Sequence, residues 1–184
     1  MKPRVILDSK HLAITIDRLC QQLIENHGDF SKTCIIGIQP RGIFLSDRIV
    51  KRLTEKLRIP KLRYGKLDVT FYRDDFRRSP KLHTPKSTAM DFSIEEMDTV
   101  LIDDVLFTGR TVRSALDALL DFGRPRRVEL MVLIDRRFSR HVPVQADYCG
   151  KSVDAVSSEY VSVEWQETHG LDKVLILEAR KGSK

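Results

Sequence analysis

The chain has 184 residues and a net charge of +6, with 41% hydrophobic and 32% charged residues. These values are typical of a globular domain with a buried core, and they exclude a low-complexity chain. The positive charge fits an anionic partner such as a phosphorylated small molecule or a nucleic acid, although many proteins that bind neither are also basic.

The three cysteines form no C-x-x-C pair, which argues against a zinc site or a disulfide framework. Free thiols in a reducing cytoplasm are the simpler interpretation. The sequence has no segment near the roughly 20 apolar residues of a membrane span, and no apolar stretch suited to a signal peptide. We therefore expect a cytoplasmic protein with no membrane contact.

Helices and a strand are predicted in the first third. Apolar residues recur at helical spacing over 11–26, which ends before Gly28, and over 43–58, which ends before Pro60. The apolar run TCIIGI at 33–38 predicts a buried strand between them.

The middle of the chain continues the alternation. Residues 66–72 alternate like a strand, whereas 73–90 are polar, basic and without a period, as in a lid or a merely solvated loop. Strands are predicted at 100–102 and 128–134, with an amphipathic helix at 111–122 between them.

Alternating strands and helices favour an α/β fold with a mostly parallel sheet and helices on both faces. The chain is less regular from Asp135 onward. Short β runs at 160–163 and 173–177 indicate a small appendage beside the sheet.

The stretch VLIDDVLFTGRTV at 100–112 carries the most chemistry. Asp103 and Asp104 follow an apolar strand, and T-G-R-T at 108–111 leads into a helix. A helix N-terminus with hydroxyl donors and a glycine suits a phosphate, while carboxylates accept hydrogen bonds from a ribose diol. A sugar phosphate would satisfy both halves, although an Asp-Asp pair can also be a helix cap or a solvated turn. The glycine patterns of a Walker loop and of a Rossmann-type nucleotide-binding protein are absent.

This stretch resembles the phosphoribosyl pyrophosphate (PRPP) motif of type I phosphoribosyltransferases. Further matching segments follow in order, and together they are similar to the PyrR family, bacterial pyrimidine-operon attenuators that are also uracil phosphoribosyltransferases. They are GIQPRGIFL (37–45), LDVTFYRDDF (67–76), IDDVLFTGRTVRSALDALLDFGRP (102–125), ADYCGK (146–151) and SEYVSV (158–163).

The resemblance implies a single domain over 1–184, built on a five-stranded parallel sheet with flanking helices. A flexible lid at about 73–90 and a hood from about 135–165 would cover the site. The implied reaction transfers the phosphoribosyl group of PRPP to uracil, giving UMP and pyrophosphate, with Mg²⁺ held mainly by the substrate. The family also suggests a homodimer or a larger homo-oligomer.

The resemblance also implies site residues. Arg73, Asp103 and Asp104 would be catalytic, the two carboxylates by binding the ribose hydroxyls. The residues implied to bind PRPP are Gln39, Pro40, Arg41, Gly42, Val105, Leu106, Phe107, Thr108, Gly109, Arg110 and Thr111. Those implied to bind the base or nucleotide are Arg136, Lys151, Ser152 and Val153.

Two positions in this pattern leave alternatives open. Arg41 could be a plain surface arginine. The Gln39–Pro40 bond matches a peptide that is often cis in the family, and because cis costs least before proline, we expect a cis bond there. After the Gly-Lys pair, residues 153–156 read V-D-A-V where the family has a Pro-Thr-Ser-like stretch, so transfer to a base other than uracil stays possible.

Regulation through a messenger RNA hairpin is the second function implied by the family. RNA binding needs a cationic face, for which the candidates are Arg18, Arg137, Arg140 and Lys151. The carboxylates of Asp17 and Glu25 on the first helix would repel RNA. Gln145 stands where an arginine is common in the family. A regulator that senses nucleotides without catalysis is therefore a further alternative.

Overall fold

A computed structural model of the chain describes residues 3–59, 62–73, 87–156 and 158–178. Most of the expected lid at 73–90 lies outside these ranges. The described helices are α1 (Ser9–His27), α2 (Gly42–Leu57), α3 (Arg110–Leu119) and α4 (Gln166–His169), with 3-10 turns η1 (Thr70–Tyr72) and η2 (Leu120–Phe122). No helix within these ranges is long and apolar enough to cross a membrane.

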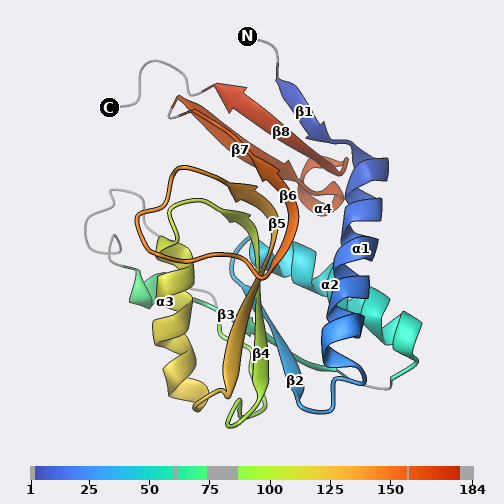
Figure 1. Cartoon of the computed structure of the whole chain (residues 1–184), viewed down its shortest axis with the longest axis vertical. Helices are drawn as coiled ribbons and strands as arrows, with labels where there is room; N and C mark the ends of the chain where they lie inside the picture. Colours follow the sequence, from blue (N-terminus) through green and yellow to red (C-terminus); the bar gives the residue numbers. More distant parts are fainter. Residues whose placement is uncertain (1–2, 60–61, 74–86, 157, 179–184) are drawn as a thin grey trace.

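Two sheets make up the strand structure (Figure 1). The larger has five strands in the order β3-β2-β4-β5-β6, and every neighbouring pair is parallel. The smaller has the order β1-β8-β7 and is antiparallel. The strands are β1 (Arg4–Leu7), β2 (Thr33–Ile38), β3 (Arg63–Leu67), β4 (Asp98–Leu106), β5 (Arg127–Arg136), β6 (Tyr148–Val153), β7 (Glu159–Glu164) and β8 (Lys173–Glu178). The parallel α/β architecture is thus confirmed.

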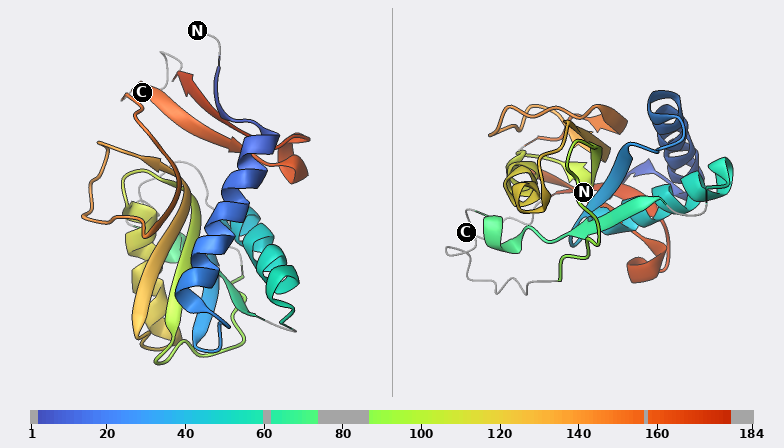
Figure 2. Two further views of the ribbon diagram at one scale, coloured as in Figure 1. Left: turned by 45° about the vertical axis from the view of Figure 1, so that its right-hand side comes forward. Right: turned by 90° about the horizontal axis from the view of Figure 1, so that it is seen from below.

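Helices cover both faces of the larger sheet, as the alternation predicts (Figure 2). On one face, α1 and α2 bury Leu19 and Ile49 in a cluster that includes Ile102 of β4. On the other face, α3 buries Ala115 in a cluster that includes Leu101. Successive β4 residues therefore serve opposite cores, which explains why this strand is apolar without alternation.

The smaller sheet shares the first of these cores. Trp165, which follows β7, is buried against this cluster and stacks on Phe44 of α2 with ring centroids 6.3 Å apart. The Arg48 guanidinium lies 4.6 Å from the same ring and also forms ion pairs with Glu167 and Asp172. The indole thus joins the smaller sheet to α2, a role that the sequence alone did not indicate.

The segment expected as a strand at 66–72 was placed wrongly. The strand is β3, which ends at Leu67, and the chain then turns into η1. The turn forms because Asp68 Oδ1 accepts hydrogen bonds from the backbone N–H (2.8 Å) and the hydroxyl (2.6 Å) of Thr70.

The hood range of 135–165 also differs from the observed boundaries. It contains β6, which is the edge strand of the larger sheet, and of the smaller sheet it includes β7 alone. The partners β1 and β8 come from opposite ends of the chain and pair with each other. Such long-range pairing leaves no local sequence pattern.

Candidate functional site

A cavity of about 370 Å³ opens at the carboxyl ends of the parallel strands. In open α/β sheets this edge is where ligands bind. The lining residues come from the chain after β2, the ends of β4 and β5, the start of α3, the end of η1, and β7. They are Gln39, Pro40, Arg41, Arg73, Asp103, Asp104, Val105, Phe107, Thr111, Arg136, Tyr160 and Val161.

The two carboxylates lie within β4, which extends to Leu106, rather than beyond its end. Asp103 and Asp104 are 8% and 5% exposed. Oδ1 of Asp103 accepts the backbone N–H of Asp104 at 2.9 Å. Oδ2 of Asp104 is buried and has no hydrogen-bond partner among the described residues. An acceptor of this kind, placed in a cavity, calls for a donor from a ligand.

Burial makes this pair of charges costly. Desolvation raises the pKa of Asp103 well above its ordinary value, and the neighbouring Asp104 charge raises it further. Desolvation also raises the pKa of Asp104, against the opposing charge of Arg41. Hydroxyl donors or a bound cation would relieve the cost, which again favours a polyol ligand over a bare anion.

Asp103→Asn should therefore stabilise the fold while impairing the site. An acid with a raised folded-state pKa binds more protons when folded than when unfolded, so stability falls as pH rises from near 3.8 through the folded pKa. Asparagine removes that loss and keeps an oxygen for the Asp104 N–H. At pH 7 we expect the melting temperature to rise, by roughly 2–4 °C for each kcal/mol of repulsion removed. A lower melting temperature at pH 7 in thermal unfolding would contradict the argument.

The loop after β2 is held against β4 by a glycine. Gly42 begins α2, and a Cβ there would lie 2.4 Å from the carbonyl oxygen of Ile102 and 2.9 Å from Cα of Asp103. Only glycine allows this close approach. The preceding Gln39–Pro40 bond is cis, as predicted, and Nε2 of Gln39 donates to the Ser87 carbonyl at 3.0 Å. The loop is thereby placed beside the carboxylates.

Gly42→Ala should move this loop and cost about 1–3 kcal/mol of stability. Because the resemblance implies that PRPP binds at this loop beside the cavity, affinity for pyrophosphate should also fall. Gly28→Ala is the matched control, since its φ is +57° but a Cβ there meets nothing within 4 Å. It should lose stability through backbone strain alone and keep pyrophosphate affinity, which titration calorimetry would measure. Equal affinities for the two variants would count against the packing argument.

The loop after β4 ends in a second tight contact. Gly109 precedes α3 with φ of +87°, and a Cβ there would lie 2.6 Å from Cγ2 of Val144. The carbonyl of Thr108 accepts the N–H groups of His141 at 2.9 Å and Val142 at 3.1 Å. The N-terminus of α3 follows, with Thr111 lining the cavity. Backbone N–H groups at a helix start suit a phosphate.

Arg136 ends β5 and is a buried cation at 4% exposure. Its guanidinium lies 4.1 Å from the Phe107 ring centroid and donates to the Val156 carbonyl at 3.2 Å. Its Nε has no hydrogen-bond partner within the described ranges. Burial lowers the pKa of this arginine. Arg136 lines the cavity, and its Nε–H would suit an acceptor on a ligand that reaches this buried donor.

The cavity gathers most, though not all, of the residues expected from the sequence. The expected residues that do not line it are Gly42, Leu106, Thr108, Gly109, Arg110, Lys151, Ser152 and Val153. Lys151 donates to the Ile6 carbonyl at 3.3 Å, and Val153 is buried in the core. Tyr160 and Val161 line the cavity instead. Their β run was visible in the sequence, but nothing local indicated that it crosses the sheet edge.

The cations expected to face RNA have partners in the fold. Arg18 donates to the carbonyls of Cys149 and Gly150, and Arg137 forms a two-pronged pair with Asp154 at 2.8 Å. Arg140 donates to several carbonyls, as described below. These arginines are thus already engaged by protein groups.

The residues present fit a magnesium ion held mainly by substrate. No group of three or more His, Cys, Asp or Glu side chains that could hold a metal occurs within the described ranges. Asp103 and Asp104 do line the cavity together. Mg²⁺ commonly takes one or two carboxylates and completes its shell with phosphate oxygens and water.

Comparisons with known proteins agree with this geometry. The family model described as phosphoribosyl transferase domain matches residues 5–168. A hypoxanthine phosphoribosyltransferase from Staphylococcus aureus superposes with a TM-score of 0.70 at 20% identity, covering 98% of this chain and 94% of that one. An HGPRT-ase from Leishmania tarentolae, solved in complex with GMP, superposes with a TM-score of 0.69 at 14% identity, covering 97% of this chain and 98% of that one. Fold, site and family match define a phosphoribosyltransferase.

Relatives with higher sequence identity show which family of phosphoribosyltransferases the chain belongs to. A bifunctional protein PyrR from Caldicellulosiruptor bescii is 42% identical over 175 residues, which is 95% of this chain and 95% of the relative. Another from Haemophilus ducreyi is 39% identical over 179 residues, covering 97% and 99%. The chain belongs to the PyrR family.

Proposed function

We propose that this protein transfers the phosphoribosyl group of PRPP to uracil, giving UMP and pyrophosphate, in the cavity at the ends of β2, β4 and β5. The observation that carries the proposal is the buried Oδ2 of Asp104, which lies between two loops shaped by glycines and has no hydrogen-bond partner in the part of the chain that the structure describes. A ribose diol supplies the missing donor, and phosphates at either end of it suit the two loops. Membership of the PyrR family supports uracil as the base and the pyrimidine operon as the regulated target.

The reaction breaks the bond between the anomeric carbon and pyrophosphate and forms a bond to a ring nitrogen of uracil, which loses its proton. Positive charge builds on the sugar as pyrophosphate leaves. Asp103 and Asp104 would hold the hydroxyls and stabilise that charge, while Arg41 and Arg73 would face the leaving group. When bound, Mg²⁺ would supply neutralisation of the pyrophosphate charge.

Arg136 would serve the base or the nucleotide. Its buried guanidinium is fixed by the Phe107 ring and the Val156 carbonyl, which leaves Nε–H for a carbonyl oxygen of the ligand. Tyr160 and Val161 would form the facing wall. Lys151, Ser152 and Val153 remain proposals for the base side, through β6 backbone rather than side chains.

The test is an assay of purified protein with PRPP, Mg²⁺ and each common base in turn, reading released pyrophosphate. Turnover with uracil is the expected result. Turnover with another base alone would move the proposal to a different phosphoribosyltransferase. Tight binding of PRPP or UMP without any turnover would favour a regulator that has kept the pocket.

A messenger RNA hairpin is the second proposed partner, because the family is named as bifunctional and the chain carries a net charge of +6. Binding should weaken steeply with salt and strengthen with UMP. Because Arg18, Arg137 and Arg140 already have protein partners, we expect weaker RNA affinity than a free basic face would give. Hairpin titration at two salt concentrations, with and without UMP, checks this.

We also propose that the protein acts in the cytoplasm as a homodimer or larger homo-oligomer, on the strength of the family resemblance. Light scattering of the purified protein would test the assembly state.

A further inference from the structure

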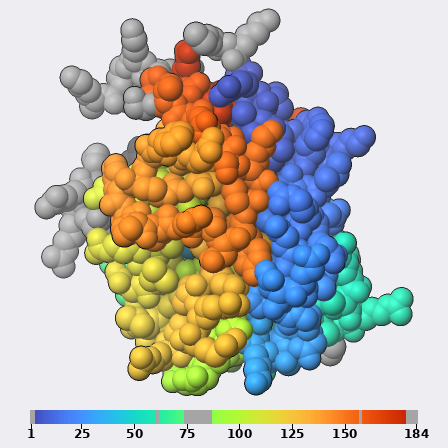
Figure 3. Space-filling model, viewed as in Figure 1, coloured from blue at the N-terminus to red at the C-terminus, as the bar shows by residue number. Residues whose placement is uncertain are grey.

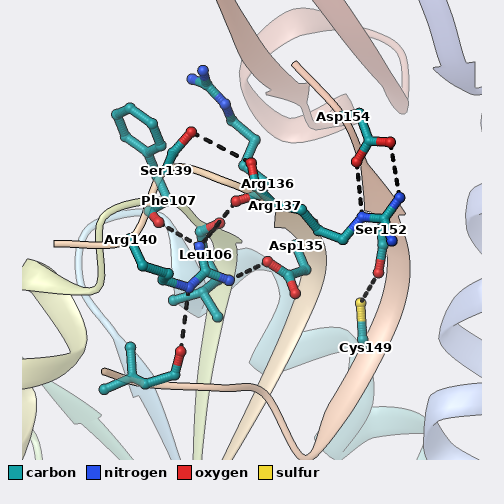
Figure 4. A network of polar contacts seen from close by, with 11 residues as sticks. Leu106, Phe107, Asp135, Arg136, Arg137, Ser139, Arg140, Cys149, Ser152 and Asp154 are labelled. Atoms are coloured by element: carbon teal, nitrogen blue, oxygen red, sulfur yellow. Dashed lines mark hydrogen bonds and ion pairs between the residues drawn. The ribbon is translucent and has the colours of Figure 1, made fainter. Parts of the chain in front are cut away.

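The segment between β5 and β6 contains an arginine, Arg140, whose side chain is directed into the protein rather than into solvent. Arg140 has a side chain only 23% exposed, and its guanidinium donates to four carbonyls and a carboxylate. Figure 4 shows this guanidinium among the dashed contacts. The acceptors are the carbonyls of Leu106 (3.3 Å), Phe107, Arg136 (3.0 Å) and Val144 (3.2 Å), and the carboxylate of Asp135.

These acceptors belong to both sides of the cavity. Leu106 is the last residue of β4 and Phe107 follows it. Both belong to the phosphate loop, which we define as residues 105–111. Asp135 and Arg136 end β5. One planar cation therefore ties the phosphate loop to the strand that carries the base-side arginine.

The residues that follow Arg140 also contact the phosphate loop. Within 140–144, which we call the strap, His141 and Val142 donate to the Thr108 carbonyl, and Val144 packs on Gly109. In the space-filling view the chain between β5 and β6, in light orange, lies on the surface beside α3, in yellow (Figure 3). The strap thus supports the phosphate loop from outside, away from the ligand.

Arg140 itself does not line the cavity, so it cannot recognise a substrate directly. Its effect on the site runs through two neighbours. It fixes the backbone of Phe107, and the Phe107 ring in turn lies against the Arg136 guanidinium. We infer that Arg140 is a positioning residue, which sets the phosphate loop and Arg136 in register for phosphoribosyl transfer. This inference rests on the proposed function.

The chemistry of the site calls for arginine rather than lysine. Five N–H groups in a rigid plane can serve several acceptors in different directions, whereas a lysine ammonium is a point charge with three donors. The carbonyls and the carboxylate around Arg140 use donors on Nε and on both terminal nitrogens. A lysine would restore the positive charge but not this set of hydrogen bonds.

The inference predicts a selective effect. The loop at 39–42 is held by other contacts, namely the Leu67 carbonyl with the Gln39 N–H and the Ser87 carbonyl with its amide. None of the contacts described for Arg140 reaches that loop. Losing Arg140 should therefore impair the 5′-phosphate side and spare the pyrophosphate side.

The experiment compares Arg140→Met and Arg140→Lys with the wild type. Titration calorimetry gives affinities for ribose 5-phosphate and, separately, for pyrophosphate with Mg²⁺, and steady-state assays give kcat and KM for PRPP. Both variants should lose at least about tenfold in ribose 5-phosphate affinity, because losing a hydrogen bond to a charged phosphate costs about that much. Pyrophosphate affinity should be unchanged. KM for PRPP should rise and kcat should fall.

Arg113→Met is the matched control. Arg113 lies on α3, is 54% exposed, and pairs only loosely with Asp117 at 3.8 Å, so its loss removes the same charge without touching the strap. It should bind both ligands like the wild type. Equal losses for both ligands in the Arg140 variants, no loss for either, or full rescue by lysine would each overturn the inference. A wild-type protein that binds neither ligand and turns over no base would instead contradict the proposed function itself.

Discussion

Asp104→Asn is expected to lower turnover by about 100-fold or more, since it removes a charge that stabilises the developing cation on the sugar. Affinity for ribose 5-phosphate should fall about 10- to 100-fold, because hydrogen bonds to charged groups contribute about 1.5–3 kcal/mol. The fold should remain intact, because neutralising a buried carboxylate whose pKa is already raised removes a cost. Pyrophosphate-release kinetics and calorimetry measure the two effects.

Two comparisons isolate the role of this carboxylate. Asp117→Asn changes the same group on the exposed face of α3 and should leave kinetics unaltered. Pyrophosphate affinity of the Asp104 variant should be retained, because the loop at 39–42 is held by other groups. Wild-type turnover in Asp104→Asn would remove the ribose assignment, and loss of pyrophosphate binding would point to a general collapse of the site.

The parallel sheet was predictable because its evidence is local. The run at 33–38 is buried at every position. The apolar residues that recur at helical spacing over 11–26, namely Leu12, Ile16, Leu19 and Leu23, are also buried. The pattern of the helix predicted at 111–122 is less exact, since its apolar residue Leu116 is 37% exposed. The smaller sheet was harder to anticipate, because β1 and β8 gain their apolar contacts only by pairing across the whole chain.

The candidate site shows the same contrast between features with local sequence evidence and features that depend on long-range contacts. Motifs contiguous in sequence, such as 39–42 and 103–111, could be assigned to a ligand site through the family resemblance, and several of their residues line the cavity where strand ends of the parallel sheet meet. The wall formed by Tyr160 and Val161 was missed because their position depends on the path of the smaller sheet. Arg140 was expected on a cationic face for RNA, because no spacing rule connects it with carbonyls more than 30 residues earlier.

Arg73→Ala is expected to lower kcat by about 100-fold, with a smaller change in the dissociation constant for PRPP. Arg73 follows η1 and lines the cavity with Arg41, on the side where pyrophosphate would leave. The turn that carries it is anchored, because the Tyr72 hydroxyl donates to Asp121 of η2. A cation held at that point interacts most strongly when negative charge has moved onto the leaving group, which happens in the transition state.

The kinetic signature separates this role from simple substrate attraction. Single-turnover rates and equilibrium binding of PRPP should be measured on Arg73→Ala, on Arg73→Lys and on Arg63→Ala, which removes the same charge from an exposed position of β3. Arg63→Ala should behave like the wild type, and lysine should restore part of the rate because charge is what the departing group needs. If Arg73→Ala loses rate and affinity equally, the arginine binds ground state and transition state alike. If neither changes, the leaving group must be stabilised from the other side, through Arg41 and the ion that the substrate carries.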